Sequence, residues 1–137
     1  MPHQRPPVEL HQHGRVLYRR KEYAKALDLY DEALSATPNP SVSLLDDHAA
    51  AHEKLGNLTS ALKDARNAMK IYPRDVTGYL RGGKILQQMG KPLVAMEIYK
   101  HGIKKKTNRV EVRLRKSTAD PRLLIRISYS RSSITTF

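Results

Sequence analysis

The 137-residue sequence contains no cysteine, no tryptophan and one phenylalanine. Without cysteine, the chain can form no disulfide, no thiol nucleophile and no cysteine-ligated zinc site. No run approaches the roughly 20 consecutive apolar residues that a membrane-spanning helix needs, and no apolar segment of the kind that directs secretion follows Met1. The sequence therefore predicts an intracellular protein without a membrane segment, whose modest core draws on 39% hydrophobic residues.

The net charge of +12 is unevenly distributed along the chain. Residues 1–75 hold eleven Lys and Arg against ten Asp and Glu, whereas residues 76–109 hold eight against one and residues 110–137 six against two. Because Lys and Arg bind phosphate without regard to base sequence, residues 76–137 leave open an association with nucleic acid or chromatin. The predicted basic patch consists of Lys100, Lys104, Lys105, Lys106 and Arg109.

Small residues recur at a spacing of 34–35 residues, most clearly at Ala26, Ala61 and Ala95. Two antiparallel helices approach closely only where their side chains are small, and larger apolar residues then fill the spaces between these contacts. A period of about 34 residues with this pattern resembles the tetratricopeptide repeat (TPR), in which each repeat is a helical hairpin. We expect an all-α fold, a TPR-type solenoid of three repeats and six helices.

Capping and breaking signals divide the first 106 residues into these six helices. Pro38 and Pro73 end helices because proline lacks a backbone N–H and clashes with the preceding turn. Gly56 is expected to take the left-handed conformation that closes a helix, and Asn57 and Asp75 are expected to cap the helices that follow them. The predicted helices cover about residues 8–20, 24–37, 42–55, 58–72, 76–89 and 92–106.

The sequence changes in kind after Lys106. Residues 110–115 alternate between apolar and charged, which is typical of a strand, and residues 128–137 are rich in Ser, Thr and Arg. We expect a non-helical, disordered tail, with an isolated hairpin as the alternative. The predicted organisation is a disordered N-terminus at 1–7, a TPR array at 8–106 and a basic tail at 107–137, with repeats at about 7–40, 42–75 and 76–109.

Two patterns resemble ligand sites without completing them. Gly78, Gly83 and Lys84 have the spacing of a phosphate-binding loop, but Ile85 follows where that loop needs Ser or Thr for magnesium. His48 and His52 lie four residues apart on one predicted helix face, but the sequence shows no third ligand, and both occupy positions that normally pack against the neighbouring helix. We therefore expect no cofactor, no metal and no enzymatic activity, since no catalytic set of residues is evident.

The first helix of each hairpin is expected to line the concave face of the array. This groove would be basic, then acidic, then basic, and could bind an extended or helical peptide whose charges fix its register. The alternative is a solvated face without a dedicated ligand. The predicted groove residues are His11, Arg15, Tyr18, Arg19, Asp46, Asp47, Ala50, Glu53, Thr77, Leu80, Arg81, Lys84 and Gln87.

TPR proteins that bind heat-shock chaperones hold a C-terminal EEVD carboxylate in a clamp of Lys, Asn and Arg. By repeat position, the clamp would fall in this sequence on His11, Arg15, Asp47, Thr77 and Arg81, of which only Arg81 matches. An aspartate in place of an asparagine would repel a carboxylate. A co-chaperone function therefore remains an alternative that the clamp positions disfavour.

The third repeat, residues 77–92 followed by 95–104, resembles the N-terminal TPR region of fungal F-box/TPR proteins. In that family the repeats precede an F-box and leucine-rich repeats, and the whole protein is a substrate adaptor of an SCF ubiquitin ligase linked to DNA replication. The resemblance implies a partner-recruiting module, with a nuclear location favoured. The sequence departs from the family after Lys106 and contains no F-box, so SCF components are expected partners only of a longer form.

Overall fold

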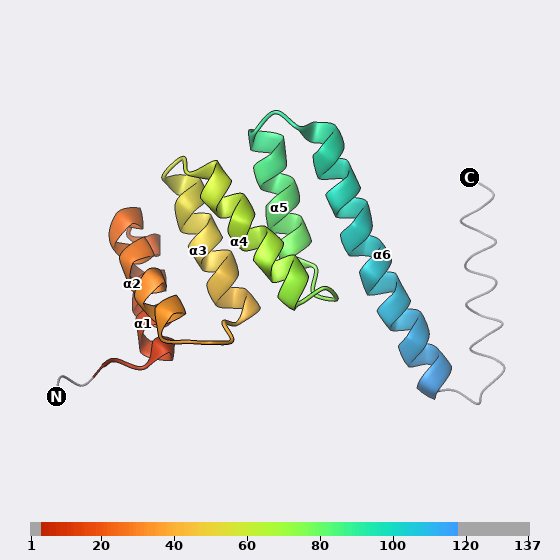
Figure 1. The fold of residues 1–137 in the computed structure, drawn as a ribbon, viewed down its shortest axis with the longest axis horizontal. Helices are drawn as coiled ribbons and strands as arrows, with labels where there is room; N and C mark the ends of the chain where they lie inside the picture. The colour runs from red at the N-terminus through yellow and green to blue at the C-terminus, as the bar shows by residue number, and fades with distance from the viewer. Residues whose placement is uncertain (1–3, 118–137) are drawn as a thin grey trace. The chain divides into compact units, whose positions relative to one another are not determined.

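The computed structural model describes the backbone of residues 4–117 and the side chains of residues 4–106. Over these residues the chain forms six α-helices and no strand (Figure 1). The prediction of an all-α solenoid of helical hairpins is confirmed. The helices are α1 (Pro7–Arg19), α2 (Tyr23–Ser35), α3 (Val42–Lys54), α4 (Leu58–Ile71), α5 (Thr77–Gln88) and α6 (Pro92–Ser117).

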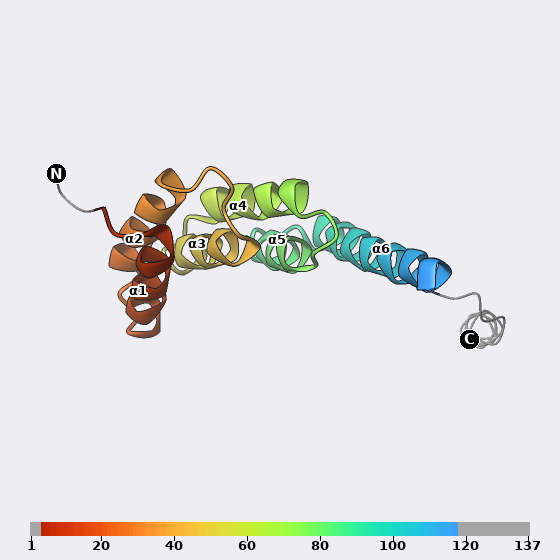
Figure 2. The same ribbon diagram turned by 90° about the horizontal axis from the view of Figure 1, so that it is seen from below.

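Consecutive helices pack side by side, α1 on α2, α2 on α3, α3 on α4 and α4 on α5. Contacts also join α1 to α3 and α3 to α5. Figure 2 shows α4 on one side of the array and α3 and α5 on the other. The first helices of the hairpins thus share one side, as expected for the face that would carry a groove.

Helix α6 is longer than the sequence suggested. The chain divides by its contacts into two units, Met1–Lys106 and Thr107–Phe137, yet α6 continues to Ser117. The prediction of a non-helical tail is therefore wrong for residues 107–117. The alternation at 110–115 is a weak signal because β-propensity depends on packing, and residues 103–117 contain no Pro or Gly and many strong helix formers. The part of this prediction that concerns residues 118–137 lies outside the described residues.

The helix ends follow the sequence signals in most places. Gly56 closes α3 with φ of 80°, the left-handed conformation predicted for it, and Gly90 follows α5 with φ of 75°. The backbone N–H of Thr77 donates to Asp75 Oδ1 at 2.9 Å, so Asp75 contacts the start of α5, although Val76 stands at the capping position. Asn57 stands at the start of α4, but its side chain makes no capping hydrogen bond, so this part of the prediction is wrong.

The core consists of two clusters, one for each end of the first unit. The first gathers buried residues of α1, α2 and α3 around Leu10 and Tyr30, and the second gathers residues of α3 to α6 around Ile85. Ala26, Ala61 and Ala95 are all 0% exposed. The repeated alanines therefore mark buried helix contacts, as their 34–35-residue spacing predicts.

Tyrosine and glycine form the same close contact in the first and third hairpins. A Cβ atom at Gly14 would overlap the ring of Tyr30, and a Cβ atom at Gly83 would overlap the ring of Tyr99. Each glycine lies on the first helix of its hairpin and each tyrosine on the second. The ring can lie against the helix backbone only because the opposite residue has no side chain.

Replacing Gly83 with alanine is expected to destabilise the array by about 1–3 kcal/mol, since the new methyl group must displace the Tyr99 ring in a packed core. The adjacent substitution Gly82→Ala is the matched control. Its Cβ would lie 3.1 Å from the end of the Met69 side chain, which is flexible and can move aside. The substitution should therefore keep the stabilisation of up to about 1 kcal/mol that alanine provides over glycine in a helix. Urea unfolding followed by helical circular dichroism measures both, and equal stabilities would show that the Tyr99 contact does not require glycine.

Candidate functional site

The side shared by α1, α3 and α5 carries two recesses. The larger, of about 700 Å³, is lined by residues of α1, α2 and α3. The smaller, of about 270 Å³, lies between α3 and α5. The residues lining the larger recess are Gln12, Arg15, Val16, Tyr18, Arg19, Tyr30 and Asp47; those lining the smaller are Asp46, Thr77, Leu80, Arg81 and Lys84. Nine of the thirteen predicted groove residues therefore line one recess or the other, while His11, Ala50, Glu53 and Gln87 line neither.

Four of these nine residues line the larger recess, namely Arg15, Tyr18, Arg19 and Asp47, and five line the smaller, namely Asp46, Thr77, Leu80, Arg81 and Lys84.

The carboxylate of Asp47 is bound from α1. Its Oδ2 atom lies 2.7 Å from His11 Nε2 and 3.2 Å from Arg15 Nε. The Asp47 side chain is 23% exposed and that of His11 15%, whereas the Arg15 side chain is 55% exposed. The aspartate charge is thus compensated inside the recess, while the guanidinium of Arg15 still faces solvent.

A second network joins α3 to α5 through Arg81. Its Nε donates to Asp46 Oδ1 at 2.8 Å and its Nη1 donates to Glu53 Oε2 at 2.7 Å. Lys84 Nζ lies 3.1 Å from Glu53 Oε1. The Arg81 side chain is 19% exposed, and these contacts raise its pKa further above the ordinary value, led by the hydrogen bond to Asp46. Arg81 therefore ties two repeats together and stays charged.

Glu53 is the most enclosed acid of this network, with a side chain that is 7% exposed. Burial alone would raise its pKa, but hydrogen bonds from Gln88, Lys84 and Arg81 outweigh burial and lower the pKa below its ordinary value of 4.5. Gln88 Nε2 donates to Glu53 Oε1 at 2.6 Å. The carboxylate is therefore held in its charged form by three donors from α5.

Two predicted groove residues have other roles. Ala50 is only 7% exposed and belongs to the core. Gln87 is exposed, and its Oε1 atom accepts a hydrogen bond from the Tyr99 hydroxyl of α6 at 3.1 Å. The residue that does join the network is Gln88, which sequence reasoning missed. Its spacing of four residues from Lys84 and seven from Arg81 places it on the same helix face and could have revealed it.

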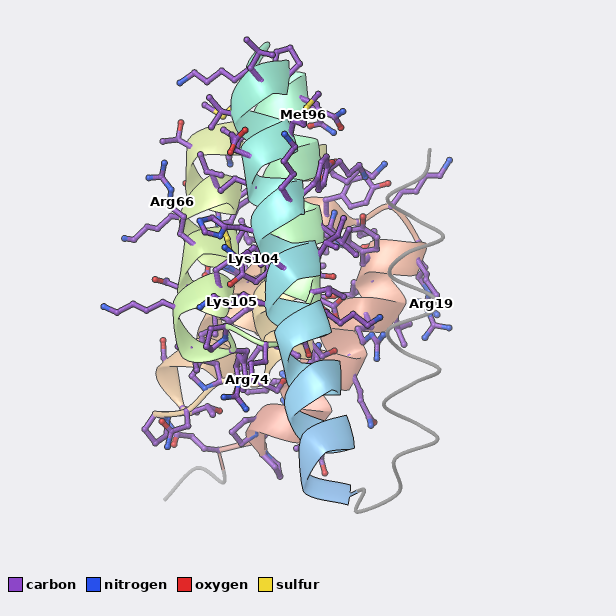
Figure 3. The ribbon with its side chains drawn as sticks, turned by 90° about the vertical axis from the view of Figure 1, so that its right-hand side faces the viewer. Arg19, Arg66, Arg74, Met96, Lys104 and Lys105 are labelled. Atoms are coloured by element: carbon purple, nitrogen blue, oxygen red, sulfur yellow. The ribbon has the colours of Figure 1, made fainter. Side chains whose placement is uncertain are left out.

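Among the predicted groove residues, the charged side chains that are exposed are positive. Arg15 and Lys84 have side chains that are 55% exposed, and Arg19 is also exposed. The three acids are recessed and paired, with side-chain exposures of 24% or less. In Figure 3, Arg19 and Arg66 of α4 lie on opposite sides of the array. A ligand approaching the α1–α3–α5 side therefore meets cations first.

His48 and His52 lie on α3, where the sequence predicts packing histidines. His48 is 7% exposed, and its Nδ1 and Nε2 atoms lie 2.6 Å from Asp64 Oδ2 and 2.7 Å from Asp31 Oδ1. The packing role of His48 is confirmed. The expectation that no third ligand accompanies the pair is wrong, because α4 brings Asp64 to a distance at which His48, His52 and Asp64 each offer an atom within 4.8 Å of the others.

The predicted basic patch lies on α6. Lys100, Lys104, Lys105 and Lys106 are exposed there, and Figure 3 shows Lys104 and Lys105 on this helix. Arg109 lies within α6, but its side chain is outside the described part of the chain. None of the helices in the described part of the chain combines the length and the hydropathy that a membrane span requires.

Comparisons with known proteins agree with the helix arrangement. Residues 10–37 match the family model described as "Tetratricopeptide repeat". The chain is 35% identical over 91 residues to Hsp70-Hsp90 organizing protein 3 of Arabidopsis thaliana, which is 66% of this chain and 16% of that protein. It is 31% identical over 85 residues to the F-box/TPR repeat protein pof3 of Schizosaccharomyces pombe, which is 62% of this chain and 15% of that protein.

Solved structures show the same fold. The Sgt2 TPR domain from Aspergillus fumigatus aligns with a TM-score of 0.67 and 28% identity, over 84% of each chain. The second TPR of Spaghetti (RPAP3), bound to the HSP90 peptide SRMEEVD, aligns with a TM-score of 0.65 over 73% of this chain and 86% of that one. Its identity is 18%, so this likeness concerns the fold alone.

The fold and the match over residues 10–37 define a helical-hairpin solenoid of the TPR type. The chain is similar in sequence and in fold to TPR repeat proteins. It spans about a sixth of the length of the curated relatives named above. The finer resemblance to F-box/TPR proteins has no advantage over the similarity to chaperone-organising proteins.

Replacing Glu53 with glutamine is expected to remove a pH-dependent contribution to stability. Because the folded pKa of Glu53 lies below 4.5, the carboxylate stabilises the array above pH 4.5 and loses this effect as pH falls through the folded pKa. The variant should therefore be less stable than the parent near neutral pH, and the difference should shrink in acid. Urea unfolding at about pH 7 and about pH 3 measures it.

The matched control for this prediction is Glu97→Gln on α6. Glu97 is 74% exposed and lies 3.7 Å from Lys100, so its substitution should change stability by less than about 1 kcal/mol at either pH. A Glu53→Gln variant with the same small, pH-independent effect would contradict the role assigned to the Arg81 network.

Proposed function

We propose that the side formed by α1, α3 and α5 binds an extended acidic peptide, and that the chain is the peptide-recognition module of a co-chaperone. The observation that carries the proposal is the outward basic charge of two recesses that lie on neighbouring helices. Arg15 and Arg19 border the larger recess, and Lys84 borders the smaller. Such a surface attracts carboxylates along the length of a peptide and steers its approach.

The negative charge of Asp47 was expected to repel an acidic ligand, but in the structure this charge is compensated. An isolated carboxylate at that position would repel the peptide, as the sequence suggests. In the structure, His11 and Arg15 both contact Asp47 Oδ2, so that the local charge is not negative once the arginine is counted. The peptide would then meet the unpaired donors of the Arg15 guanidinium.

Arg81, which alone matches the chaperone clamp, has a different place in this proposal. Its donors are directed at Asp46 and Glu53. An acidic peptide would have to displace these acids to reach it, and that exchange would leave a buried carboxylate without its partner. We therefore assign peptide recognition to Arg15, Arg19 and Lys84, and the joining of the repeats to Arg81.

The relatives support this partner class. One is named for organising Hsp70 and Hsp90, and one structural neighbour of low identity holds an HSP90 peptide in a solenoid of this fold. A co-chaperone of this kind would act inside the cell, in line with the sequence-based expectation. The nuclear preference expected from the F-box resemblance receives no support from these relatives.

The full chain is expected to bind the peptide SRMEEVD, and Arg15→Ala and Lys84→Ala are each expected to weaken binding by about 10–100-fold. The expected loss follows from removing one charge-assisted hydrogen bond of about 1.5–3 kcal/mol. Fluorescence anisotropy of a labelled peptide measures the affinity. Raising the salt concentration should weaken binding of the parent chain, because the contacts are between exposed charges.

The matched control is Arg66→Ala on α4, which removes an exposed arginine from the opposite side of the array. It should leave peptide affinity unchanged. Equal losses in the Arg15→Ala and Arg66→Ala variants would show that net charge alone attracts the peptide. A full chain that does not bind SRMEEVD would contradict the co-chaperone function.

A second candidate is the partner-recruiting part of an F-box adaptor, favoured by the similarity to pof3 over 85 residues. The same α1–α3–α5 side would then receive a substrate protein. Failure to bind SRMEEVD, together with loss of a substrate interaction in the Arg15→Ala variant, would support this candidate. Association of residues 76–137 with nucleic acid stays a prediction from charge alone.

A further inference from the structure

Three helices bring an imidazole pair and two carboxylates together away from the proposed peptide side. His48 and His52 lie one turn apart on α3, Asp64 lies on α4 and Asp31 on α2. The two imidazole rings are 4.6 Å apart between centroids and nearly perpendicular. A metal ion needs ligand atoms that converge from several directions, and the side chains of this cluster come together from three helices.

We propose that His48, His52 and Asp64 bind a divalent transition-metal ion, with Zn²⁺ as the best match. Each residue offers one ligand atom, and these atoms all lie within 4.8 Å of one another. Two imidazole nitrogens and a carboxylate oxygen form a ligand set that suits zinc, with a water molecule in the fourth position. Hard cations such as Mg²⁺ and Ca²⁺ prefer an all-oxygen set and would bind poorly here.

The ligand atoms lie within 4.8 Å of one another, so a zinc ion would require side-chain shifts of about 1 Å or somewhat more. Zinc bonds of about 2.0–2.2 Å to nitrogen and oxygen separate two tetrahedral ligand atoms by about 3.4 Å. His48 Nδ1 and Asp64 Oδ2 are 2.6 Å apart, so they would have to move apart by less than about 1 Å. Nε2 of His48 donates to Asp31, and Nδ1 donates to Asp64 when the metal-free imidazole carries both protons. The ion would take the place of the Nδ1 proton, which passes to solvent.

Asp31 completes the arrangement from outside the ligand set. Its Oδ1 atom accepts a hydrogen bond from His48 Nε2 at 2.7 Å. A carboxylate on the far nitrogen of a ligating histidine fixes the ring orientation and increases the basicity of the ligating nitrogen. This contact leaves Nδ1 of His48 directed toward Asp64 and the site.

An unsatisfied atom gives independent support. His52 Nδ1 is buried and has no hydrogen-bond partner among the described residues. A buried polar atom without a partner costs about 1–3 kcal/mol, and coordination or a bound water molecule would relieve that cost. His52 is also only partly buried as a residue, so solvent can reach the cluster from its side.

A bound ion would join the first two repeats. His48 and His52 belong to α3 and Asp64 to α4, the two helices of the second hairpin. Through His48, the same ion would be linked to Asp31 of the first hairpin. The metal would therefore stabilise the packing of the repeats without entering the proposed peptide side.

The test is a titration of the full 137-residue chain with Zn²⁺ by calorimetry and with Co²⁺ by visible absorption. The expected result is one saturable site and the intense absorption of four-coordinate cobalt. His52→Gln should weaken zinc binding by at least about tenfold and remove the cobalt band. Asp31→Ala should weaken zinc binding by about 10–100-fold, as outer-shell partners do, while the cobalt band remains at saturation.

The matched control is His101→Gln, which removes an exposed histidine of α6 and should leave zinc affinity unchanged. Circular dichroism confirms that each variant is folded, and His52→Gln breaks no described hydrogen bond of the Nδ1 atom. Absence of saturable zinc binding, or zinc binding that His52→Gln leaves intact, would overturn the proposal. Peptide binding is measured separately, so its failure would leave the metal site unaffected.

Discussion

Close approach of helix backbones is the constraint on which the remainder of the structure depends. Ala26, Ala61 and Ala95 are completely buried, and the rings of Tyr30 and Tyr99 lie where even a methyl group on the facing glycine would overlap them. Helix backbones can approach this closely only if small residues recur wherever two helices cross. The period of the small residues therefore sets the angle and spacing of the hairpins, and with them the side on which α1, α3 and α5 gather.

This stacking separates two kinds of polar contact. On the α1–α3–α5 side, acids are recessed and paired while Arg15 and Lys84 extend outward. Between α2, α3 and α4, the side chains of His48 and Asp64 are enclosed and directed at each other, and the exposed Asp31 contacts the other nitrogen of His48. The first arrangement leaves cations exposed, as the proposed peptide binding requires, whereas the second uses its charge within the fold. The difference in exposure is what distinguishes a recognition surface from an internal junction.

Arg81 illustrates how the tertiary structure changes the meaning of a residue. Its position in the repeat matches a carboxylate clamp, but its donors are taken by Asp46 and Glu53 from the neighbouring repeat. The position in the repeat predicts where the backbone places a side chain. It does not predict which residue across the groove forms hydrogen bonds with that side chain. The same limit explains Gln88, which reaches Glu53, while its neighbour Gln87 turns to Tyr99.

The sequence by itself determined the helical hairpins, their order and most of their ends, because period, proline and glycine act locally along the chain. It also placed the charged residues of α1, α3 and α5 on one side, since helical spacing decides which residues share a face. Only the tertiary structure decided which of those charges pair, and that Asp64 comes to His48 across sixteen residues of chain. Local signals carry no information on such contacts, because distances between side chains on different helices depend on how the helices pack.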